Sequence, residues 1–170
     1  GFLCGPAYFQ MSYNGNRIIL RYAFSPMPSL PQLPLPMPER MQSLLQQALP
    51  EFHSVEWVGR TTSTNADLMQ RARADKGVLA RPWLLGAHLQ ERGRGRSGRS
   101  WQNRSGANLM FSCAFDVFLP PLALPTLAPF AGVVATEALR GMLTASSRPL
   151  LTMKWPNDIE WRFAKLAGIL

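Results

Sequence analysis

The feature that most restricts the fold of this chain is a run of prolines near its N-terminus, where proline recurs almost every second residue over 26–38. Each proline removes a backbone N–H donor and pushes the residue before it toward an extended conformation. We therefore expect residues 1–52 to form an extended N-terminal segment, with a short helix over 41–49 where apolar residues recur at helical spacing. A docking peptide for the aromatic groove of a partner is the alternative use of such a segment.

A folded domain with both helices and strands is expected over residues 53–170. Two stretches have the spacing of helices: one is capped by Ser63 or Thr64 and ends at Lys76-Gly77, and the other covers 127–142. Prolines at 120, 121 and 125 are expected to break the chain before the second helix. Short apolar runs predict strands at 55–58, 84–90, 109–118, 151–155, 159–163 and 165–170.

The charge of the chain favours anionic partners. Its 170 residues carry a formal net charge of +8, which suits nucleic acid, an acidic membrane or a phosphate-bearing small molecule. Cys4 and Cys113 lie far apart without metal-ligand spacing, so we expect two free thiols in a reducing compartment. We find neither a signal peptide nor a run of about 20 apolar residues, and a cytoplasmic location is the expectation.

The most informative stretch is the loop GRGRSGRSW at residues 93–101. Its glycines permit close approach of the backbone to a ligand, and its arginines offer planar forks that bind phosphate or carboxylate oxygens at two points. Three interpretations stay open: a phosphate-binding loop, an RNA-binding segment, or a solvated surface loop. The loop lies between two apolar strands inside a folded domain, where active-site loops tend to lie, and this favours the first.

Two further motifs are candidates for a site. KWPND at residues 154–158 follows an apolar strand, so the Lys154 ammonium should emerge at the end of a sheet, while Asn157 and Asp158 could orient a ligand or hold magnesium. Pro-Asn-Asp is also strong turn chemistry in its own right. Residues 63–65, Ser-Thr-Asn, can cap a helix and offer free N–H groups to a polar ligand.

These motifs, in this order, resemble the biotin–protein ligase family, and the resemblance spans about residues 55–170. It rests on TSTN at 62–65, Gln90, the loop at 93–101, GANL at 106–109, KWPND at 154–158 and KLAGIL at 165–170. The resemblance implies an α+β fold of the class II aminoacyl-tRNA synthetase type, with a mixed, largely antiparallel sheet flanked by helices. It also implies an ATP-dependent enzyme that forms biotinyl-5′-AMP and transfers biotin to a lysine of a biotin carboxyl carrier protein.

The resemblance also assigns roles to individual residues. Lys154, Arg94 and Arg96 would be catalytic, and ATP, Mg2+ and biotin would be the small molecules bound. The phosphate-binding loop would contain Gly93, Arg94, Gly95, Arg96, Gly98 and Arg99. The biotin site would contain Ser63, Thr64, Asn65, Gln90, Trp101 and Gly168. Asn157, Asp158 and Lys165 would support the site, and no metal ligand is assigned.

The chain departs from the family pattern in several places. Asn103-Arg104 replaces the usual Ser-Pro, which we interpret as a minor change, and Arg162-Phe163-Ala164 is poor turn chemistry. The family's later segments do not follow Leu170, so we expect an incomplete catalytic domain whose own activity is open. We also expect no DNA-binding winged helix and no membrane partner. A homodimer is compatible with these expectations.

Three rival readings remain. A lipoate or octanoate ligase or transferase of the same fold is the nearest. An Arg-Gly-rich RNA-binding protein is the rival from another class, and its affinity should depend steeply on salt. A catalytically inactive fragment that binds a partner is the third.

Overall fold

The computed structural model describes residues 8–14, 17–23, 34–75, 80–93, 95 and 100–170. The chain divides into two units, residues 1–34 and residues 35–170. In the first unit, β1 (Tyr8–Asn14) and β2 (Arg17–Ala23) form an antiparallel hairpin, with Tyr8 opposite Ala23. The sequence predicted an extended segment here and gave no indication that its two halves pair.

The second unit begins earlier than the expected boundary at residue 52. Helix α1 (Pro38–Ala48) packs against β3, and its Met41 is buried in the same apolar cluster as Val55 and Trp57. The short helix expected over 41–49 is therefore confirmed, and Pro38 starts it because the first helical position needs no N–H donor. Residues 35–52 thus belong to the folded unit, since α1 supplies part of its core.

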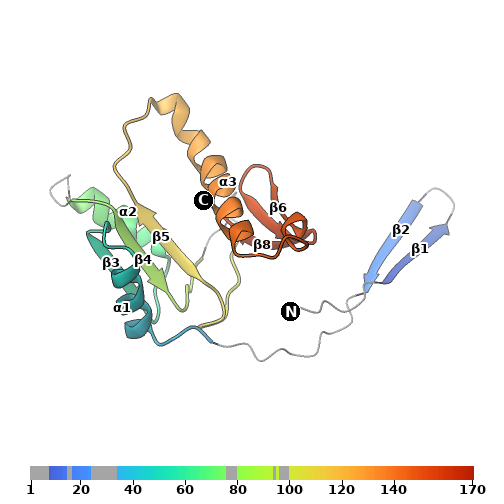
Figure 1. Ribbon diagram of the computed structural model, residues 1–170, viewed down its shortest axis with the longest axis horizontal. Coiled ribbons are helices and arrows are strands. Elements are labelled where there is room, and N and C mark those ends of the chain that lie inside the picture. The colour runs from blue at the N-terminus through green and yellow to red at the C-terminus, as the bar shows by residue number, and fades with distance from the viewer. Residues whose placement is uncertain (1–7, 15–16, 24–33, 76–79, 94, 96–99) are drawn as a thin grey trace. The chain divides into compact units, whose positions relative to one another are not determined.

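The first sheet of this unit has the strand order β3–β4–β5, with β3 (Ser54–Val58), β4 (Trp83–Ala87) and β5 (Met110–Ala114). Strand β3 runs parallel to β4, and α2 (Thr64–Asp75) connects them, while β5 is antiparallel to β4. Figure 1 shows α1 and α2 beside this sheet. A parallel pair needs such a crossover connection, which explains why a helix lies between these two strands.

Strand β4 is buried along its whole length because helices cover both of its faces. Leu84 packs with Val55, Trp57 and α1, whereas Trp83 and Leu85 pack with Leu68 of α2. Successive side chains of a strand point to opposite faces, so this alternation places β4 in the middle of a helix–sheet–helix arrangement. A continuous apolar run is the pattern expected of such a strand.

The second sheet is an antiparallel meander of β6 (Leu151–Lys154), β7 (Asp158–Trp161) and β8 (Ala164–Gly168). Helix α3 (Leu127–Gly141) covers it, and Gly132 lies so close to Met153 that a Cβ on the glycine would approach the Met153 methyl carbon to 2.7 Å. The short helix η3 (Arg148–Leu150) leads into β6. The mixed, largely antiparallel architecture is confirmed, and its strands are divided between separate sheets.

The turn between β7 and β8 forms from residues that the sequence marked as poor turn formers. Trp161 and Ala164 pair, and the two residues between them, Arg162 and Phe163, have φ of 49° and 65°. A tight two-residue hairpin turn requires positive φ at both of its central residues, because the twist of the turn then matches the twist of the two strands. The pairing of β7 with β8 therefore imposes a left-handed backbone on two residues that rarely adopt it.

The prolines at 120, 121 and 125 do not break the chain as expected. The 3₁₀ helix η2 (Pro121–Thr126) begins at one of them and runs directly into α3. Pro121–Gly141 is consequently one helical stretch that is long and apolar enough to cross a membrane, a finding that differs from the expectation of no such run. A helix that packs on a sheet can have the same length and apolar composition as a membrane-spanning helix. Helix α3 packs on β6 and β7.

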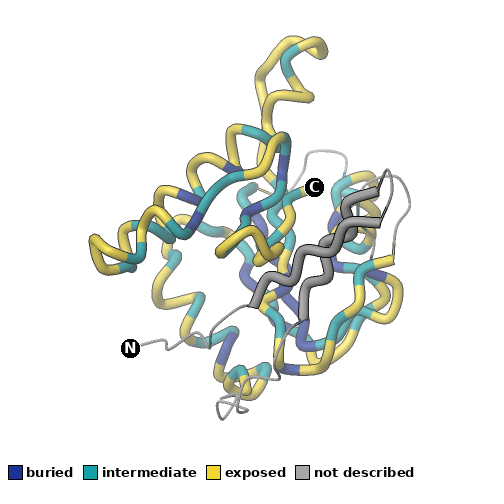
Figure 2. The backbone as a smooth tube through the Cα atoms, turned by 90° about the vertical axis from the view of Figure 1, so that its right-hand side faces the viewer, coloured by how far each residue is buried: buried dark blue, intermediate teal, exposed yellow. Residues whose placement is uncertain are grey.

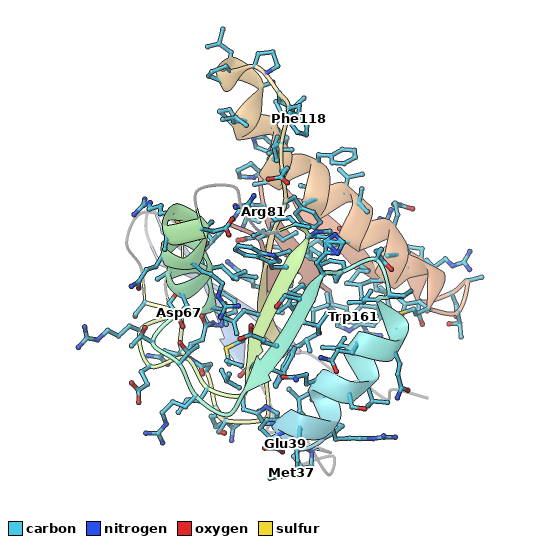
Figure 3. The ribbon with its side chains drawn as sticks, turned by 90° about the vertical axis from the view of Figure 1, so that its left-hand side faces the viewer. Met37, Glu39, Asp67, Arg81, Phe118 and Trp161 are labelled. Atoms are coloured by element: carbon cyan, nitrogen blue, oxygen red, sulfur yellow. The ribbon has the colours of Figure 1, made fainter. Side chains whose placement is uncertain are left out.

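Much of this helical stretch is exposed, as the largely yellow tube over η2 and α3 in Figure 2 shows. Gly132 and Thr136 are buried against the sheet. Figure 3 shows Phe118 at the outer end of the preceding segment, and this side chain is 95% exposed. In the same figure Arg81 lies between the elements it joins, bonding to Asp75 at the end of α2 and to Asp116 after β5.

Candidate functional site

The first part of the candidate site is a polar network at the start of α2. Ser63 Oγ accepts a hydrogen bond from Ala66 N, as expected of a helix cap. Thr64 is 2% exposed, and its backbone N and its Oγ1 both donate to Gln90 Oε1, at 2.9 and 3.2 Å. Asn65 is exposed in the first turn. Three predicted residues, Ser63, Thr64 and Gln90, are thus brought together from segments far apart in the chain.

Ser112 completes this network, and the sequence analysis missed it. Its hydroxyl lies 2.8 Å from Thr64 Oγ1, and it comes from β5. A lone serine within the apolar run of residues 109–118 was the available signal, because a polar residue on a half-buried strand needs a partner. The network therefore joins α2, the segment after β4, and β5.

The base of the glycine-arginine loop is held by Asn103, which was interpreted as a minor departure. Its carboxamide accepts from Gln90 N at 3.1 Å and donates to Gln90 O at 2.8 Å. Trp101 N donates to Gly93 O at 2.8 Å, which closes the loop. Asn103 thereby fixes the backbone of Gln90, whose side chain bonds Thr64. The structural role of Asn103 is therefore larger than the sequence indicated.

Several predicted loop residues lie outside the described part of the chain: Arg94, Arg96, Gly98 and Arg99. Gly93 is buried, and a Cβ there would approach Trp101 Cβ to 3.3 Å and Gln90 Cβ to 3.6 Å, so this position leaves little space for a side chain. Gly95 is half-buried.

The second part of the candidate site is the charged surface of the β6–β7–β8 sheet. Lys154 ends β6 and is exposed, as predicted, and its Nζ lies 3.3 Å from Glu160 of β7. Lys165 Nζ lies 2.8 Å from Asp158 Oδ1 and 5.3 Å from the centre of the Trp101 ring. The contact between Lys165 and Trp101 joins the loop to the charged sheet, so the two parts of the site adjoin.

Asn157 and Gly168 make or permit contacts within the β6–β7–β8 sheet that the sequence did not predict. Asn157 is buried, and its Nδ2 donates to Ile169 O at 2.6 Å while Ile169 N donates to Asn157 O. These bonds fasten the turn after β6 to the end of β8. A Cβ at Gly168 would meet Lys165 Nζ at 3.1 Å and Asp158 Oδ1 at 3.4 Å, so glycine leaves room there for the ion pair.

The described residues contain no group of three or more His, Cys, Asp or Glu side chains placed to hold a metal ion. The Asp158 carboxylate, suggested as a magnesium ligand, bonds Lys165 instead. Burial raises the pKa of the Cys113 thiol, which keeps it protonated near neutral pH and unsuited to act as a thiolate nucleophile. The described residues of the site therefore supply hydrogen-bonding groups, two lysines and two carboxylates.

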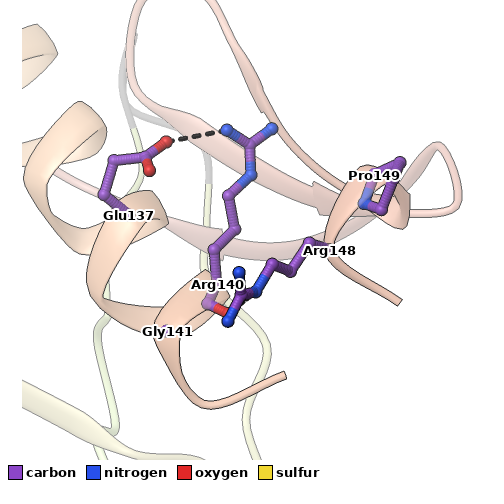
Figure 4. A pocket seen from close by; sticks show the side chains of 5 residues that line it. All are labelled: Glu137, Arg140, Gly141, Arg148 and Pro149. Carbon is purple, nitrogen blue, oxygen red and sulfur yellow. Dashed lines mark hydrogen bonds and ion pairs between the residues drawn. The ribbon is translucent and has the colours of Figure 1, made fainter. Parts of the chain in front are cut away.

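A shallow depression lies elsewhere, at the end of α3, and is lined by Glu137, Arg140, Gly141, Arg148 and Pro149 (Figure 4). Its central arginine is already bonded, because Arg140 pairs with Glu137 at 2.7 Å and donates to Leu151 O. None of these residues belongs to the predicted site, and we assign the depression no role.

Fold and site together define an α+β domain in which a polar network adjoins a sheet surface with paired lysines and carboxylates, and comparison with known proteins identifies its class. The model of the biotin/lipoate A/B protein ligase family matches residues 58–170. The chain belongs to this family.

Curated relatives are similar over most of the chain. It is 36% identical over 121 residues to a biotin–[acetyl-CoA-carboxylase] ligase of Mycobacterium tuberculosis, which covers 70% of this chain and 44% of the relative. It is 38% identical over 108 residues to the bifunctional ligase/repressor BirA of Escherichia coli, covering 64% of this chain and 31% of the relative. The chain thus spans less than half the length of either relative.

Solved structures agree on the fold. A biotin protein ligase of Leishmania major in complex with biotinyl-5-AMP aligns with a TM-score of 0.56 and 27% identity, covering 69% of this chain and 51% of the other. The same enzyme in complex with biotin gives the same TM-score. The resemblance stated from the sequence motifs is confirmed at the level of family and fold.

Proposed function

We propose that this chain contributes to an ATP-dependent ligase that activates biotin as biotinyl-5′-AMP and transfers it to a lysine of a biotin carboxyl carrier protein. The observation that carries the proposal is the charged surface of β6–β7–β8, where Lys154 is exposed and Lys165 lies against Trp101 of the glycine-arginine loop. Family membership supports it, as do relatives that are named biotin ligases or bind biotinyl-5-AMP.

The chemistry of such a reaction explains why cations and hydrogen-bond donors are needed. A carboxylate oxygen of biotin attacks the α-phosphorus of ATP, the bond to the β-phosphate oxygen breaks, and pyrophosphate leaves. Carboxylate and triphosphate repel each other, so positive charge must bring them together. Lys154, with Arg94 and Arg96, would supply that charge where negative charge develops in the transition state.

The second step is acyl transfer. The neutral amine of the carrier lysine attacks the acyl carbon of biotinyl-5′-AMP, loses a proton and forms an amide, while AMP leaves with the electrons of the broken acyl–oxygen bond. Trp101 would cover the adenylate and limit its reaction with water. Lys165 supports that position, because its ammonium lies over the Trp101 ring.

Biotin itself would be bound by the network of Ser63, Thr64, Asn65 and Gln90, together with Gly168. Gln90 Oε1 accepts hydrogen bonds from the backbone N and the Oγ1 of Thr64. A ligand oxygen that accepts hydrogen bonds could take the place of Gln90 Oε1, and both Thr64 donors would then stay satisfied.

Magnesium is not assigned to any residue. No suitable cluster of carboxylates exists among the described residues, and Asp158 is engaged by Lys165. The ion commonly binds through substrate phosphates, so Mg2+ would arrive with ATP. A cytoplasmic location is consistent with the free thiol of Cys113.

The test is calorimetric binding of a non-hydrolysable biotinyl-adenylate analogue, with the lipoyl analogue in parallel. Binding selective for the biotinyl compound is expected, and Lys154→Met should weaken it by about ten- to a hundredfold, the range for losing a charged hydrogen bond. Arg40→Met is the matched control, because Arg40 is exposed on α1 and lies outside the site.

Two results would count against the proposal. Tighter binding of the lipoyl analogue would favour the lipoate ligase alternative. Binding of RNA with a steep dependence on salt, together with no affinity for either adenylate, would favour the RNA-binding interpretation.

A further inference from the structure

The β6–β7–β8 sheet has one apolar and one charged face, and the charged face carries two lysines and two carboxylates. Met153, on the apolar face, lies against α3. Lys154 pairs with Asp158 in register, and Glu160 pairs with both Thr152 and Lys165. Residues paired or two apart share a face of a sheet, so all four charges lie on the same side.

The central strand β7 supplies both carboxylates, one to each lysine. Asp158 bonds Lys165 of β8 at 2.8 Å, and Glu160 bonds Lys154 of β6 at 3.3 Å. The four formal charges sum to zero. An anionic substrate that approaches one of these lysines meets a carboxylate already bonded to it and competes with that carboxylate for the ammonium.

The two pairs differ in how firmly the lysine is held. Lys165 bonds Asp158 and lies over the Trp101 ring, and the space that a Cβ at Gly168 would need is taken up by its ammonium. Lys154 has Glu160 as its ion-pair partner, and its side chain is 66% exposed against 44% for Lys165. Lys154 is therefore the cation that can turn toward a ligand at lower cost.

Glu160 differs from Lys154 in exposure. Its side chain is 14% exposed, so little water can replace the lysine when the pair separates. A partly desolvated carboxylate without its counter-ion is unfavourable, and this cost opposes the departure of Lys154.

We propose that Glu160 is a positioning residue that competes with the anionic substrate for Lys154: it holds the lysine in the ligand-free protein and lowers the affinity of the site for phosphate and carboxylate groups. The proposal rests on the proposed function for the identity of the substrate. The competition itself concerns this chain's charges and applies to any phosphate anion. Sequence reasoning gave Glu160 no role, because its contact with Lys154 depends on the pairing of β6 with β7.

Calorimetric titration of the 170-residue chain with inorganic pyrophosphate tests the competition without biotin. Glu160→Gln keeps the size of the side chain and removes its charge, so we expect pyrophosphate to bind about two- to fivefold more tightly, the effect of removing a partly exposed ion pair. Glu160→Asp keeps the charge and should bind pyrophosphate nearly as the unaltered chain does.

The double variant Lys154→Met with Glu160→Gln separates competition from a general loss of negative charge. It leaves no unpaired carboxylate, so it avoids the instability expected of Lys154→Met alone, and we expect no gain in affinity. Glu137→Gln removes another carboxylate from an ion pair, the one with Arg140 on α3, and should leave affinity unchanged.

Either an unchanged affinity in Glu160→Gln or an equal gain in the double variant would overturn the proposal. The biotinyl-adenylate analogue is titrated separately into the same proteins. Failure of the unaltered chain to bind that analogue would count against the biotin function, whereas the pyrophosphate results would still decide the role of Glu160.

Discussion

At the scale of single residues, the carboxamide of Asn103 connects the two parts of the polar network. It bonds both backbone polar groups of Gln90, and its Nδ2 also lies 3.4 Å from Trp101 O. The side chain of Gln90 in turn accepts from Thr64. One asparagine thus fixes the positions of a proposed biotin contact and of the end of the loop.

Asn103→Ala is expected to lower the free energy of unfolding by about 1–3 kcal/mol, because two backbone groups of Gln90 lose their partner. Asn103→Asp keeps the acceptor but loses the donor, so it should fall between Asn103→Ala and the unaltered chain. Urea unfolding measures both. Asn108→Ala is the control, since Asn108 makes an exposed bond to Arg104 N, and a loss there as large as at Asn103 would contradict the assignment.

A second residue-scale expectation concerns acid stability. The hydrogen bonds from Arg71 to Glu56, at 2.5 and 3.0 Å, hold the pKa of Glu56 below its ordinary 4.5. Because the pKa of Glu56 is lower in the folded protein, its ion pair adds stability above pH 4.5. That stability is lost as the pH falls through the pKa that Glu56 has in the folded protein. Arg71→Met should therefore make the free energy of unfolding less dependent on pH below 4.5.

Urea unfolding of the Arg71→Met variant over a series of acidic pH values measures this effect. Arg40→Met on α1 serves as the control, because Arg40 is exposed and pairs with no carboxylate among the residues that the structure describes. If the free energy of unfolding of Arg71→Met depends on pH as it does in the unaltered chain, other carboxylates determine the acid stability.

At the scale of elements, the pairing of β3 with β4 depends on one glycine. Trp57 and Gly86 are opposite each other in the parallel register, and a Cβ on Gly86 would lie 2.1 Å from the Trp57 ring. The indole therefore lies over Gly86, and its Nε1 donates to His88 Nδ1 at 2.8 Å. His88 also contacts Pro36 O through Nε2, which connects the sheet with the segment before α1.

Gly86→Ala should destabilise the domain by about 1–3 kcal/mol or more, since the methyl group forces the ring out of a close-packed position. Gly141→Ala is the matched control, because a Cβ there has nothing within 4 Å at the end of α3. Thermal unfolding compares the two. Equal melting temperatures for both variants would show that Trp57 can move aside freely.

At the scale of the whole molecule, the folded unit exposes apolar side chains along η2 and α3. Large apolar side chains with more than a third of their area exposed include Leu122, Leu124, Leu127, Phe130, Val133 and Val134. Exposed apolar surface of this extent commonly marks an interaction site. A possible homodimer was one of the sequence-based expectations and stays a prediction.

We expect the chain to associate with itself through this surface at raised concentration, as measured by sedimentation velocity. Replacing Leu122 and Phe130 together by serine should weaken association by about tenfold or more, given the value of burying two large apolar side chains. Met37→Ser is the control, because Met37 is exposed just before α1. Association that is unaffected by the double replacement would place the contact elsewhere.

Most secondary-structure elements of residues 53–170 could be predicted, because local pattern determines them. Short apolar runs predicted β3 and β4, and the three- and four-residue spacing predicted α3. The family, and the exposed position of Lys154, also followed from short ordered motifs.

The sequence by itself determined these elements, the family and the order of the candidate motifs along the chain. Tertiary structure decided which polar side chains meet. Ser112 reaches Thr64, Asn103 reaches Gln90 and Glu160 reaches Lys154 through strand pairing and loop closure. It also decided that η2 continues into α3 and that Arg162 and Phe163 form a tight turn. The physical reason is that periodicity reports local burial, whereas contacts between segments depend on register and packing.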